Sequence, residues 1–600
     1  MIKSVKTKLI HSIFSDRLQV DKRYLQSLDS RALLQNFTLE AGVILENNQI
    51  TPDPSNTYLH WGWESPTCQL RGHFLGHWMS ASSKIIYAEG DRELEAKLYD
   101  IVDKLAEYQK LNGDGWVAPI PQKYMYILRQ TDRYIWSPQY TMHKFLMGLI
   151  DTYEYTGYER ALSIFSGLAD WYTAWTKDND VKCPEATYLG ETGGMLEIWA
   201  RAYMLTKESK YLDLAHAYDH PALFYALSKG EDPLTDNHAN ASIPWSHGLC
   251  AMYLATGEEK YLGLAKKFWD CAVKDRESYA TNGQNAGEFW IPKGKLGEYM
   301  SDRNQEFCTV YNMVRLADYL FKFTGEREYQ DYIERCIYNG FLAQQNPHTG
   351  MPTYFLPMKS GSKKTWGSKT HDFWCCHGTM VQSPTLYQSL IFYYDEDKKT
   401  VTLSQFIPGK TEIDIEGSKY ILELSSDDKG SPVDTLFEET ADSKVSRWNY
   451  VLNIECDSEK EFALKIRIPE WASDKIDISS DDLSKEETEN IKNGYLKIRK
   501  AFGRAKIRFG FNADLYLAPL PDRKDLAAVM EGPIVIASVG ESALLKDEPN
   551  KCLLPKTERV YQTVPWMQSH YFLPTKGSDR DFMPLYEIVD EQYSIYQRIK

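Results

Sequence analysis

Two hydrophobic patterns divide the chain near residue 396. Up to that point, apolar positions recur at helical spacing on both sides of short turns, as in YEYTGYERALSIF and YLATGEEKYLGLA. Beyond it, segments such as KYILELSS and EFALKIRIPEW are short, alternate apolar and polar residues, and are separated by turn residues. Because the strands follow the helices and do not alternate with them, the pattern predicts a helical region followed by antiparallel β-structure.

A repeated turn motif organises the helical region. An aromatic residue lies three positions before a threonine, and glycine or lysine with a charged pair follows. The threonines of the four copies are Thr156, Thr206, Thr256 and Thr324. Gly157, Gly257 and Gly325 suit the left-handed position that ends a helix, and a weaker copy surrounds Gly90. Recurring helical hairpins predict either an open solenoid or a closed (α/α) toroid, and we favour the closed (α/α)6 barrel.

The same patterns predict three regions. Residues 1–396 are expected to form the barrel with a short N-terminal extension, 397–520 a β-sandwich, and 521–600 a second strand-rich segment. Loops between the hairpins are rich in Trp, His, Gly and Pro, and loops gathered at one end of a ring would build a pocket. In NAGEFW, the glycine before Glu288 and the aromatic residues after it suggest a loop that faces such a pocket.

The overall charge narrows the class of partner. The chain contains 69 Lys and Arg against 84 Asp and Glu, a formal net charge of −15. Nucleic acid and anionic membrane surfaces both favour basic patches, so neither is expected as a main partner. The 40 tyrosines and 16 tryptophans can fill cores and interfaces, or they can form platforms for a polar, ring-shaped ligand. Composition leaves these two interpretations open.

The N-terminal segment and the cysteines bear on the compartment. His11, Ser12 and Asp16 interrupt the apolar run that a signal peptide needs, and no later segment approaches a membrane-spanning run. We therefore expect a cytoplasmic protein. Disulfides are rare in that compartment, so most of the ten cysteines are expected to be buried small hydrophobes or metal ligands.

Adjacent cysteines in HDFWCCHGTM are the most unusual chemical feature. Cys375 and Cys376, together with Glu306 and Cys308 of NQEFCTVYNM, supply three sulfurs and one carboxylate. That donor set is sufficient for one tetrahedral Zn²⁺ site. Spacing alone is only suggestive, because Glu-x-Cys is common by chance and paired cysteines are not the CxxC knuckle of structural zinc. Unrelated buried thiols are the alternative.

Several histidines have an ordinary structural interpretation beside a functional one. His73 and His77 stand four residues apart, so one helix face could present both to a metal ion. More often such histidines hydrogen-bond a neighbour or line a pocket. For His143, His238 and His247, taken one at a time, a structural role is the more common interpretation.

Many dispersed motifs, taken in order, resemble glycoside hydrolase family 127, whose characterised members are β-L-arabinofuranosidases. The motifs include LQNFTLEAG, WGWESPTCQLRGHFLGHWMSA, YTMHK, GGMLE, YFLPM and FWCCHGTM. The resemblance runs from about residue 14 to residue 400 and continues more loosely into the predicted sandwich. It implies an (α/α)6 barrel followed by β-sandwich domains, in agreement with the patterns above.

The resemblance also implies roles for individual residues. The family's zinc ligands fall on Glu306, Cys308, Cys375 and Cys376. Its nucleophile falls on Cys375 and its general acid/base on Glu288. Sugar contacts fall on His143, His247 and Tyr354, with His238 as a further contact. Glu191 in GETGGMLE stands where some members have a sugar-binding histidine, which affects the identity of the sugar and not the reaction class.

A zinc-bound thiolate nucleophile would make the expected reaction a retaining one. Cys375 would form a thioglycosyl-enzyme while Glu288 protonates the leaving oxygen and later deprotonates water. The expected activity is exo-hydrolysis of terminal β-L-arabinofuranosides from a small oligosaccharide or glycoside. Two alternatives remain: a related glycosidase acting on another furanose or an acidic sugar, and a non-catalytic sugar-binding protein with structural zinc. A homodimer is left open, because toroid enzymes with appended sandwiches often pair.

Overall fold

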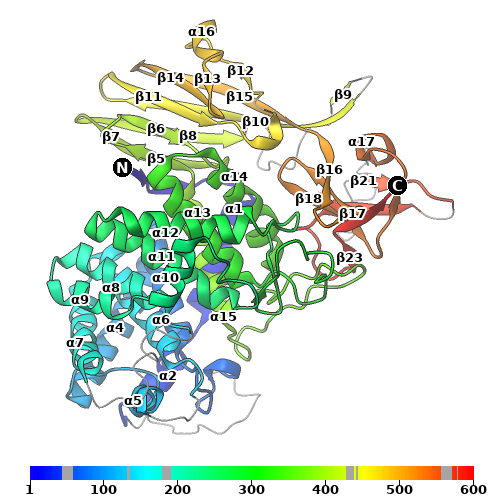
Figure 1. Ribbon diagram of the computed structural model, residues 1–600. Coiled ribbons are helices and arrows are strands. Elements are labelled where there is room, and N and C mark those ends of the chain that lie inside the picture. The colour runs from blue at the N-terminus through cyan, green and yellow to red at the C-terminus, as the bar shows by residue number, and fades with distance from the viewer. Residues whose placement is uncertain are drawn as a thin grey trace.

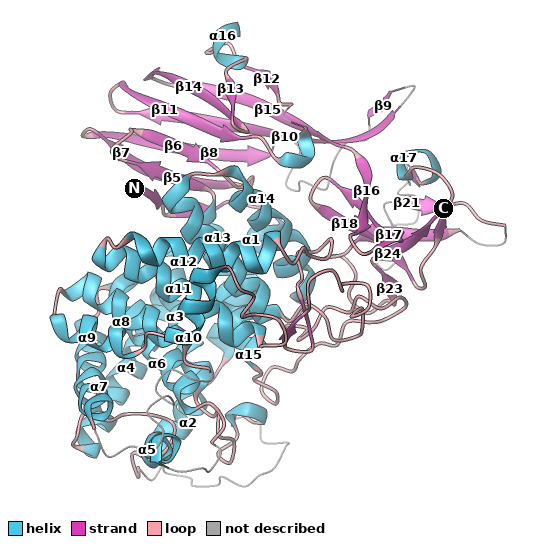
Figure 2. Cartoon of the chain, in the orientation of Figure 1, coloured by secondary structure: helices cyan, strands magenta, loops and turns pink. Residues whose placement is uncertain are grey.

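The computed structural model describes residues 1–43, 59–130, 135–178, 191–426, 438–440, 443–473, 475–555, 571–576 and 579–600. In Figure 1 the helices form one body, a two-layered set of strands lies above it, and a third group of strands lies beside it near the C-terminus. Figure 2 shows the same division by secondary structure, with helices and strands in separate parts of the molecule. The order predicted from the sequence, helices and then strands, is confirmed.

Six helices form the inner ring of the barrel. They are α3 (His73–Glu89), α6 (Pro138–Thr156), α8 (Gly193–Thr206), α11 (Ala239–Thr256), α13 (Phe307–Thr324) and α15 (Cys375–Leu390). Each contacts the next, and α15 contacts α3, so the ring is closed. The inner helices are buried on nearly all sides, which explains why their sequences show weak polar faces. The closed toroid, and not the open solenoid, is therefore confirmed.

Six further helices cover the inner ring from outside. They are α1 (Ile13–Ser27), α4 (Arg92–Asn112), α7 (Glu159–Lys177), α9 (Ser209–Ala217), α12 (Glu259–Trp269) and α14 (Arg327–Cys336). They are amphipathic: α4, for example, buries Leu94, Leu98 and Leu105 and exposes its charged residues. The region also contains α2 (Ser30–Glu40), α5 (Lys123–Gln130) and α10 (Pro221–Lys229).

The repeated turn joins an inner helix to the following outer helix. Gly90, Gly157, Gly257 and Gly325 end inner helices with φ between 71° and 73°. In the remaining copy Lys207 adopts φ 64° at the same position. The left-handed cap deduced from the sequence is confirmed at each of these glycines.

The sandwich consists of two sheets. One has the order β1 (Ile2–Ser4), β5 (Phe392–Asp395), β6 (Thr400–Leu403), β11 (Lys460–Arg467), β14 (Tyr495–Phe502), β13 (Ile491–Lys492). The other has the order β12 (Asp477–Ser479), β15 (Ala505–Ala513), β10 (Ser443–Cys456), β8 (Ser418–Ser426), β7 (Gly409–Ile415), β2 (Thr7–Leu9), with β9 (Glu438–Thr440) paired to β10. Alternate residues are buried along β7 and β8, as the period-two pattern predicts. Tyr420 and Phe462 meet between the sheets with ring centroids 5.1 Å apart.

Two features of the sandwich differ from the simple antiparallel arrangement predicted. Strand β6 pairs with β11 in parallel, because β11 arrives from the opposite sheet and not through a hairpin. The N-terminal strands β1 and β2 pair with β5 and β7, so the chain begins in the sandwich before it enters the barrel.

The buried Arg467 of β11 forms ion pairs with Asp331 (2.5 Å) and Glu334 (2.6 Å) of α14, which join the sandwich to the barrel.

A third sheet occupies the C-terminal region. Its order is β19 (Leu544–Leu545), β24 (Tyr596–Ile599), β17 (Arg523–Glu531), β18 (Ile534–Val539), β22 (Arg580–Pro584), β21 (Tyr571–Leu573), β20 (Leu554–Pro555), with β16 (Leu515–Leu520) on β17 and β23 (Tyr593–Ser594) on β18. The last strand therefore lies inside the sheet, between β19 and β17. The division at residues 396 and 520 stays a prediction.

Candidate active site

The N-terminal ends of the inner helices meet at one end of the barrel. Glu306 is the N-cap of α13, His238 is the N-cap of α11, and Cys375 is the first residue of α15. Helix N-termini carry partial positive charge and unpaired N–H groups, so this end of the ring favours anionic side chains and ligands. It is also the end that carries the loops identified from the sequence.

Four side chains from α13 and α15 form a buried cluster. One carboxylate oxygen of Glu306 and the sulfurs of Cys308, Cys375 and Cys376 all lie within 4.8 Å of one another. The sulfurs of Cys308 and Cys376 are 3.5 Å apart, and the Cys375 sulfur is 3.5 Å from Glu306 Oε1. Glu306 Oε2 is buried and has no hydrogen-bond partner among the described residues. The structure thus brings together the four residues that the sequence suggested as a donor set.

The cluster fits a metal ion by its chemistry as well as its geometry. Burial raises the pKa of the Glu306 carboxyl and of all three cluster thiols well above their ordinary values. Four such groups stay protonated when nothing compensates their charge, whereas a bound divalent cation favours the deprotonated forms. The three sulfurs and the Glu306 carboxylate, one oxygen of which has no partner among the described residues, could therefore hold a metal ion.

Neighbouring side chains fix the cluster ligands in place. Asn285 Oδ1 accepts hydrogen bonds from the Glu306 backbone N–H (3.2 Å) and from the Thr309 hydroxyl (3.0 Å). The Thr379 hydroxyl lies 3.2 Å from the Cys308 sulfur. Gly378 lies where α15 meets α3, and an added Cβ there would be 2.1 Å from the His77 ring. Sequence analysis missed Asn285 and Thr379, because their role depends on contacts between elements that are separate in the sequence.

Glu288 and Tyr354 lie beside the cluster. The Tyr354 hydroxyl donates a hydrogen bond to Glu288 Oε1 and lies 3.4 Å from the Cys375 sulfur. His238 Nε2 is 3.7 Å from Glu288 Oε2, and its Nδ1 accepts from the Ala241 backbone N–H. Tyr354 therefore connects the carboxylate to the sulfur through one hydroxyl group. Glu288 keeps about a third of its side chain exposed, so it is accessible from the pocket.

The remaining predicted contacts differ in their surroundings. Burial raises the pKa of Glu191, which interacts with His238 and Glu288 at the same end of the barrel. His143 is buried, and its Nε2 has no partner among the described residues. His247 Nε2 lies 2.8 Å from the Asn312 carbonyl oxygen and Nδ1 lies 3.2 Å from Arg315, so both ring nitrogens already contact protein atoms. The structure does not bring His247 into contact with the cluster.

The histidine pair of α3 has a structural role. His73 Nε2 lies 2.8 Å from the Phe373 carbonyl oxygen, and His77 Nδ1 lies 2.7 Å from Gln382 Oε1. Both rings are fully buried, and burial lowers the pKa of each below its ordinary value. The ordinary interpretation of this pair is confirmed. Their neighbour in space, Lys144, escaped the sequence analysis; its buried ammonium lies 4.6 Å from the Tyr140 ring centroid.

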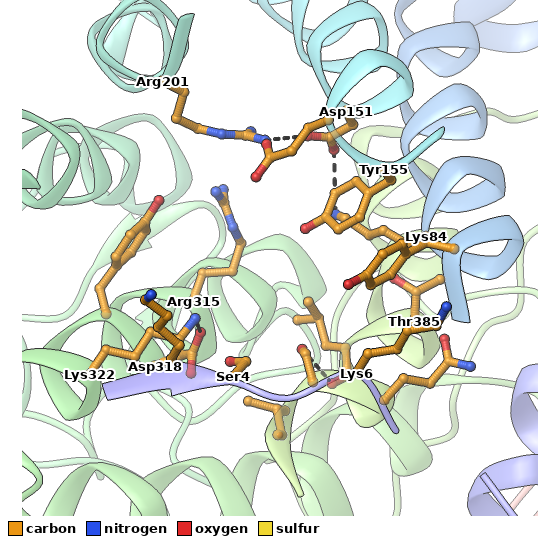
Figure 3. Close-up of a pocket in the computed structure, with 18 of the residues that line it drawn as sticks. Ser4, Lys6, Lys84, Asp151, Tyr155, Arg201, Arg315, Asp318, Lys322 and Thr385 are labelled. Atoms are coloured by element: carbon orange, nitrogen blue, oxygen red, sulfur yellow. Dashed lines mark hydrogen bonds and ion pairs between the residues drawn. The ribbon is translucent and has the colours of Figure 1, made fainter. Parts of the chain in front are cut away.

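A cavity of about 550 Å³ lies at the other end of the barrel from the cluster. Figure 3 shows Lys84, Asp151, Arg201 and Arg315 projecting into it from inner helices. Asp151 lies 2.6 Å from Arg201 and 3.5 Å from Lys84. Every acidic side chain that lines this cavity has a basic partner, so the cavity satisfies its own charges.

The described residues contain nine of the ten cysteines and all the helices named above. The nine cysteines there are all free, and six of them are buried, which agrees with the expectation that most would be buried thiols or metal ligands. None of the described helices combines the length and apolar character needed to cross a bilayer.

Comparison with known proteins gives a family match over most of the chain. The model of the β-L-arabinofuranosidase GH127 catalytic domain matches residues 6–389. No curated protein of known function matches the sequence. Three solved structures resemble the whole molecule at identities that establish the fold alone.

The first of these is a GH127 β-L-arabinofuranosidase from Geobacillus stearothermophilus T6, with TM-score 0.73 and 14% identity over 99% of this chain and 100% of that one. The second is the GH127 β-arabinofuranosidase BT3674, with TM-score 0.74 and 17% identity over 100% and 98%. A third, described as a glycoside hydrolase, gives TM-score 0.71 and 13% identity over 100% and 98%. With a family model that covers more than half of its length, the chain belongs to glycoside hydrolase family 127.

Proposed function

We propose that the protein is a retaining exo-β-L-arabinofuranosidase that uses Cys375 as nucleophile and Glu288 as general acid/base. The observation that carries this proposal is the contact chain from Glu288 through the Tyr354 hydroxyl to the Cys375 sulfur. A thiol and a carboxylate on either side of one hydroxyl resemble the nucleophile and acid/base pair of retaining glycosidases. The choice of arabinofuranose as the sugar rests on the activity named for the family and for two structural relatives.

Zn²⁺ is the ion that the cluster fits best. Glu306, Cys308, Cys375 and Cys376 would hold it. When bound, zinc supplies the positive charge that keeps buried thiols deprotonated. The N-terminal position of Cys375 on α15 acts in the same direction, because the helix dipole stabilises a thiolate there.

The protein's own residues account for both halves of the reaction. In the first, the Cys375 sulfur attacks the anomeric carbon while Glu288 gives its proton to the departing oxygen. In the second, Glu288 removes a proton from water, which displaces the sulfur from the same carbon. Two displacements at one carbon retain its configuration. Tyr354 would orient Glu288 through the hydrogen bond that its hydroxyl donates, and the same oxygen accepts from the Cys375 thiol while that thiol is protonated.

Sugar recognition is proposed at the same end of the barrel. Glu191, His238 and His143 would contact the furanose hydroxyls, with Glu191 in place of a histidine found in some family members. His247 is a weaker candidate, because its two nitrogens already contact Asn312 and Arg315. The substitution at Glu191 supports the alternative of a related glycosidase for another furanose or an acidic sugar. A cytoplasmic location and a homodimer stay predictions.

The test combines metal content, activity and product anomer. Purified protein should contain about one zinc per chain and release arabinose from 4-nitrophenyl β-L-arabinofuranoside with retained configuration, as followed by NMR. Cys375→Ser and Glu288→Gln should each lower kcat by at least about a thousandfold while the protein stays folded. Retained activity in both variants would contradict the mechanism. If both are inert and so is the wild type, while zinc is present, the non-catalytic sugar-binding alternative is favoured.

A further inference from the structure

A pocket of about 620 Å³ adjoins Glu288. Glu288 and Tyr354 line it, whereas none of the four cluster residues does. In a retaining glycosidase, the acid/base contacts the oxygen that joins the sugar to its leaving group. The pocket contacts the acid/base Glu288 and not the nucleophile Cys375. It therefore has the position expected for the leaving group. Its volume lies in the range of ordinary small-molecule sites.

Two tryptophans shape this pocket for a ring. Trp63, in the short 3₁₀ turn Gly62–Glu64, and Trp374, which precedes Cys375, both line it and are partly exposed. The Trp374 ring packs against Tyr354 with centroids 5.6 Å apart, so it is fixed relative to the catalytic pair. Partly exposed indole faces give an apolar platform beside polar groups, which suits the face of a sugar ring.

Two cations of the pocket lack acidic partners. Arg303 and Lys363 line it, and neither forms an ion pair with any described residue. Asp302, which also lines the pocket, accepts a hydrogen bond from the Ser362 hydroxyl and lies 3.5 Å from Lys359. In a chain of net charge −15, unpaired cations at the rim of a pocket attract an anionic ligand and raise its local concentration.

The Arg303 guanidinium and the backbone segment that carries Lys363 are both anchored to neighbouring groups. The Arg303 guanidinium lies 5.2 Å from the Phe355 ring centroid, and its backbone carbonyl accepts a hydrogen bond (2.6 Å) from Gly287, next to the acid/base. Lys363 lies on a segment that is anchored to the C-terminal sheet. Within it, Gly361 N–H donates to the Tyr593 carbonyl oxygen (3.0 Å), and Tyr593 N–H donates to the Ser362 carbonyl oxygen (2.9 Å).

We propose that this pocket is the leaving-group subsite and that Arg303 and Lys363 select a leaving group that carries a carboxylate on its ring, a sugar of the uronic acid class. A guanidinium pairs with a carboxylate through two parallel hydrogen bonds, and the lysine adds a mobile positive charge. The C-terminal sheet then contributes to specificity, because it holds the segment that bears Lys363. This inference rests on the proposed function and adds the class of the leaving group.

The experiment compares two disaccharides that differ in one group. β-L-Arabinofuranosyl-galacturonic acid and β-L-arabinofuranosyl-galactose, with the same linkage, are supplied to the wild type, and kcat/KM is measured from released arabinose. We expect the acidic substrate to be preferred about tenfold, and the preference to weaken as NaCl is raised. Arg303→Ala and Lys363→Ala should each lower the acid-to-neutral ratio about fivefold, and Arg303→Glu should invert it.

Lys369→Ala is the matched control. Lys369 is an exposed lysine of the same region and does not line the pocket, so its loss should leave the ratio unchanged. Equal kcat/KM for the two disaccharides in the wild type would overturn the inference and leave the proposed function standing. An unchanged ratio in Arg303→Ala and Lys363→Ala would also overturn it. If the wild type releases arabinose from none of the three substrates, both proposals are overturned.

Discussion

The two ends of the helical barrel place acidic groups in opposite circumstances. At the N-terminal end, Glu306 and three cysteines converge, and one carboxylate oxygen has no partner among the described residues. At the C-terminal end, Glu197 contacts Arg315 and Asp151 contacts Arg201, so protein cations compensate the acids. Under the proposed function, the first end takes its compensating cation from solution, whereas protein cations serve the second.

Helix polarity explains part of this difference. The ring's N-termini attract negative charge, and its C-termini attract positive charge. Six basic and four acidic side chains line the C-terminal cavity, an excess that complements the helix ends. A ring of parallel helices therefore offers one end for an anionic reactive group and one end for a self-contained network. The following predictions test whether activity and stability are divided between the two ends in this way.

The largest effect is expected from a cluster ligand compared with a buried cysteine elsewhere. Cys376→Ser should weaken zinc binding by at least about a hundredfold and abolish hydrolysis, because it removes one of four donors. Cys250→Ala is the matched control: Cys250 is a fully buried thiol of α11 outside the cluster. Metal analysis and arabinose release measure both. Zinc and activity that survive in Cys376→Ser would show that the cluster is not the metal site.

The charge network should govern stability and not catalysis. Arg315→Met removes the arginine that pairs with the buried Glu197 carboxylate, which we expect to destabilise the protein by about 3 to 5 kcal/mol. Combining it with Glu197→Leu should recover most of that loss. Thermal unfolding measures the effect, and kcat is compared well below the melting temperature. A single variant as stable as the wild type would refute the role given to this pair.

Acid should weaken the same network. Burial opposes ionisation of Glu197, but Arg315, His247 and Arg201 outweigh it and lower its pKa from 4.5 to about 2. Its stabilisation is therefore complete above pH 4.5 and is lost as the pH falls from 4.5 towards 2. The contribution is about 3 kcal/mol, since one pKa unit corresponds to about 1.4 kcal/mol. Glu197→Gln should be less stable at neutral pH and lose less stability over that range. The measurement is the free energy of unfolding of both proteins between pH 7 and pH 2. An equal loss of stability in the two proteins as the pH falls would count against the prediction.

The smallest effect concerns the helix ends themselves. Gly257→Ala should destabilise the protein by about 1 kcal/mol, because φ at this cap is 73° and an added Cβ would meet no other atom. Lys207 adopts φ 64° at the equivalent cap, so Lys207→Gly should stabilise by about 0.5 kcal/mol. Both should leave kcat unchanged, as measured by unfolding and kinetics. Opposite signs would show that side-chain contacts, and not backbone geometry, decide these positions.

The comparison also shows why the candidate site was only partly predictable. The chemistry of Cys375, Cys376, Glu306 and Cys308 suggested a donor set, because few residue types bind zinc, and the family resemblance then assigned these four as ligands. Their convergence could not be predicted, since residues 308 and 375 meet only when α13 and α15 become neighbours in the closed ring. The contacts of His247 with Asn312 and Arg315 likewise depend on neighbouring helices.

Local sequence determined the elements of this protein. Helical hairpins, their left-handed glycine caps and the alternating strands depend on residues within a few positions of one another, so period and composition reveal them. Tertiary structure decided which elements became neighbours: β1 and β2 join the sandwich, α15 closes the ring against α3, and the C-terminal sheet holds the pocket segment with Lys363. These pairings join residues hundreds of positions apart, and only the packing of the whole chain selects them.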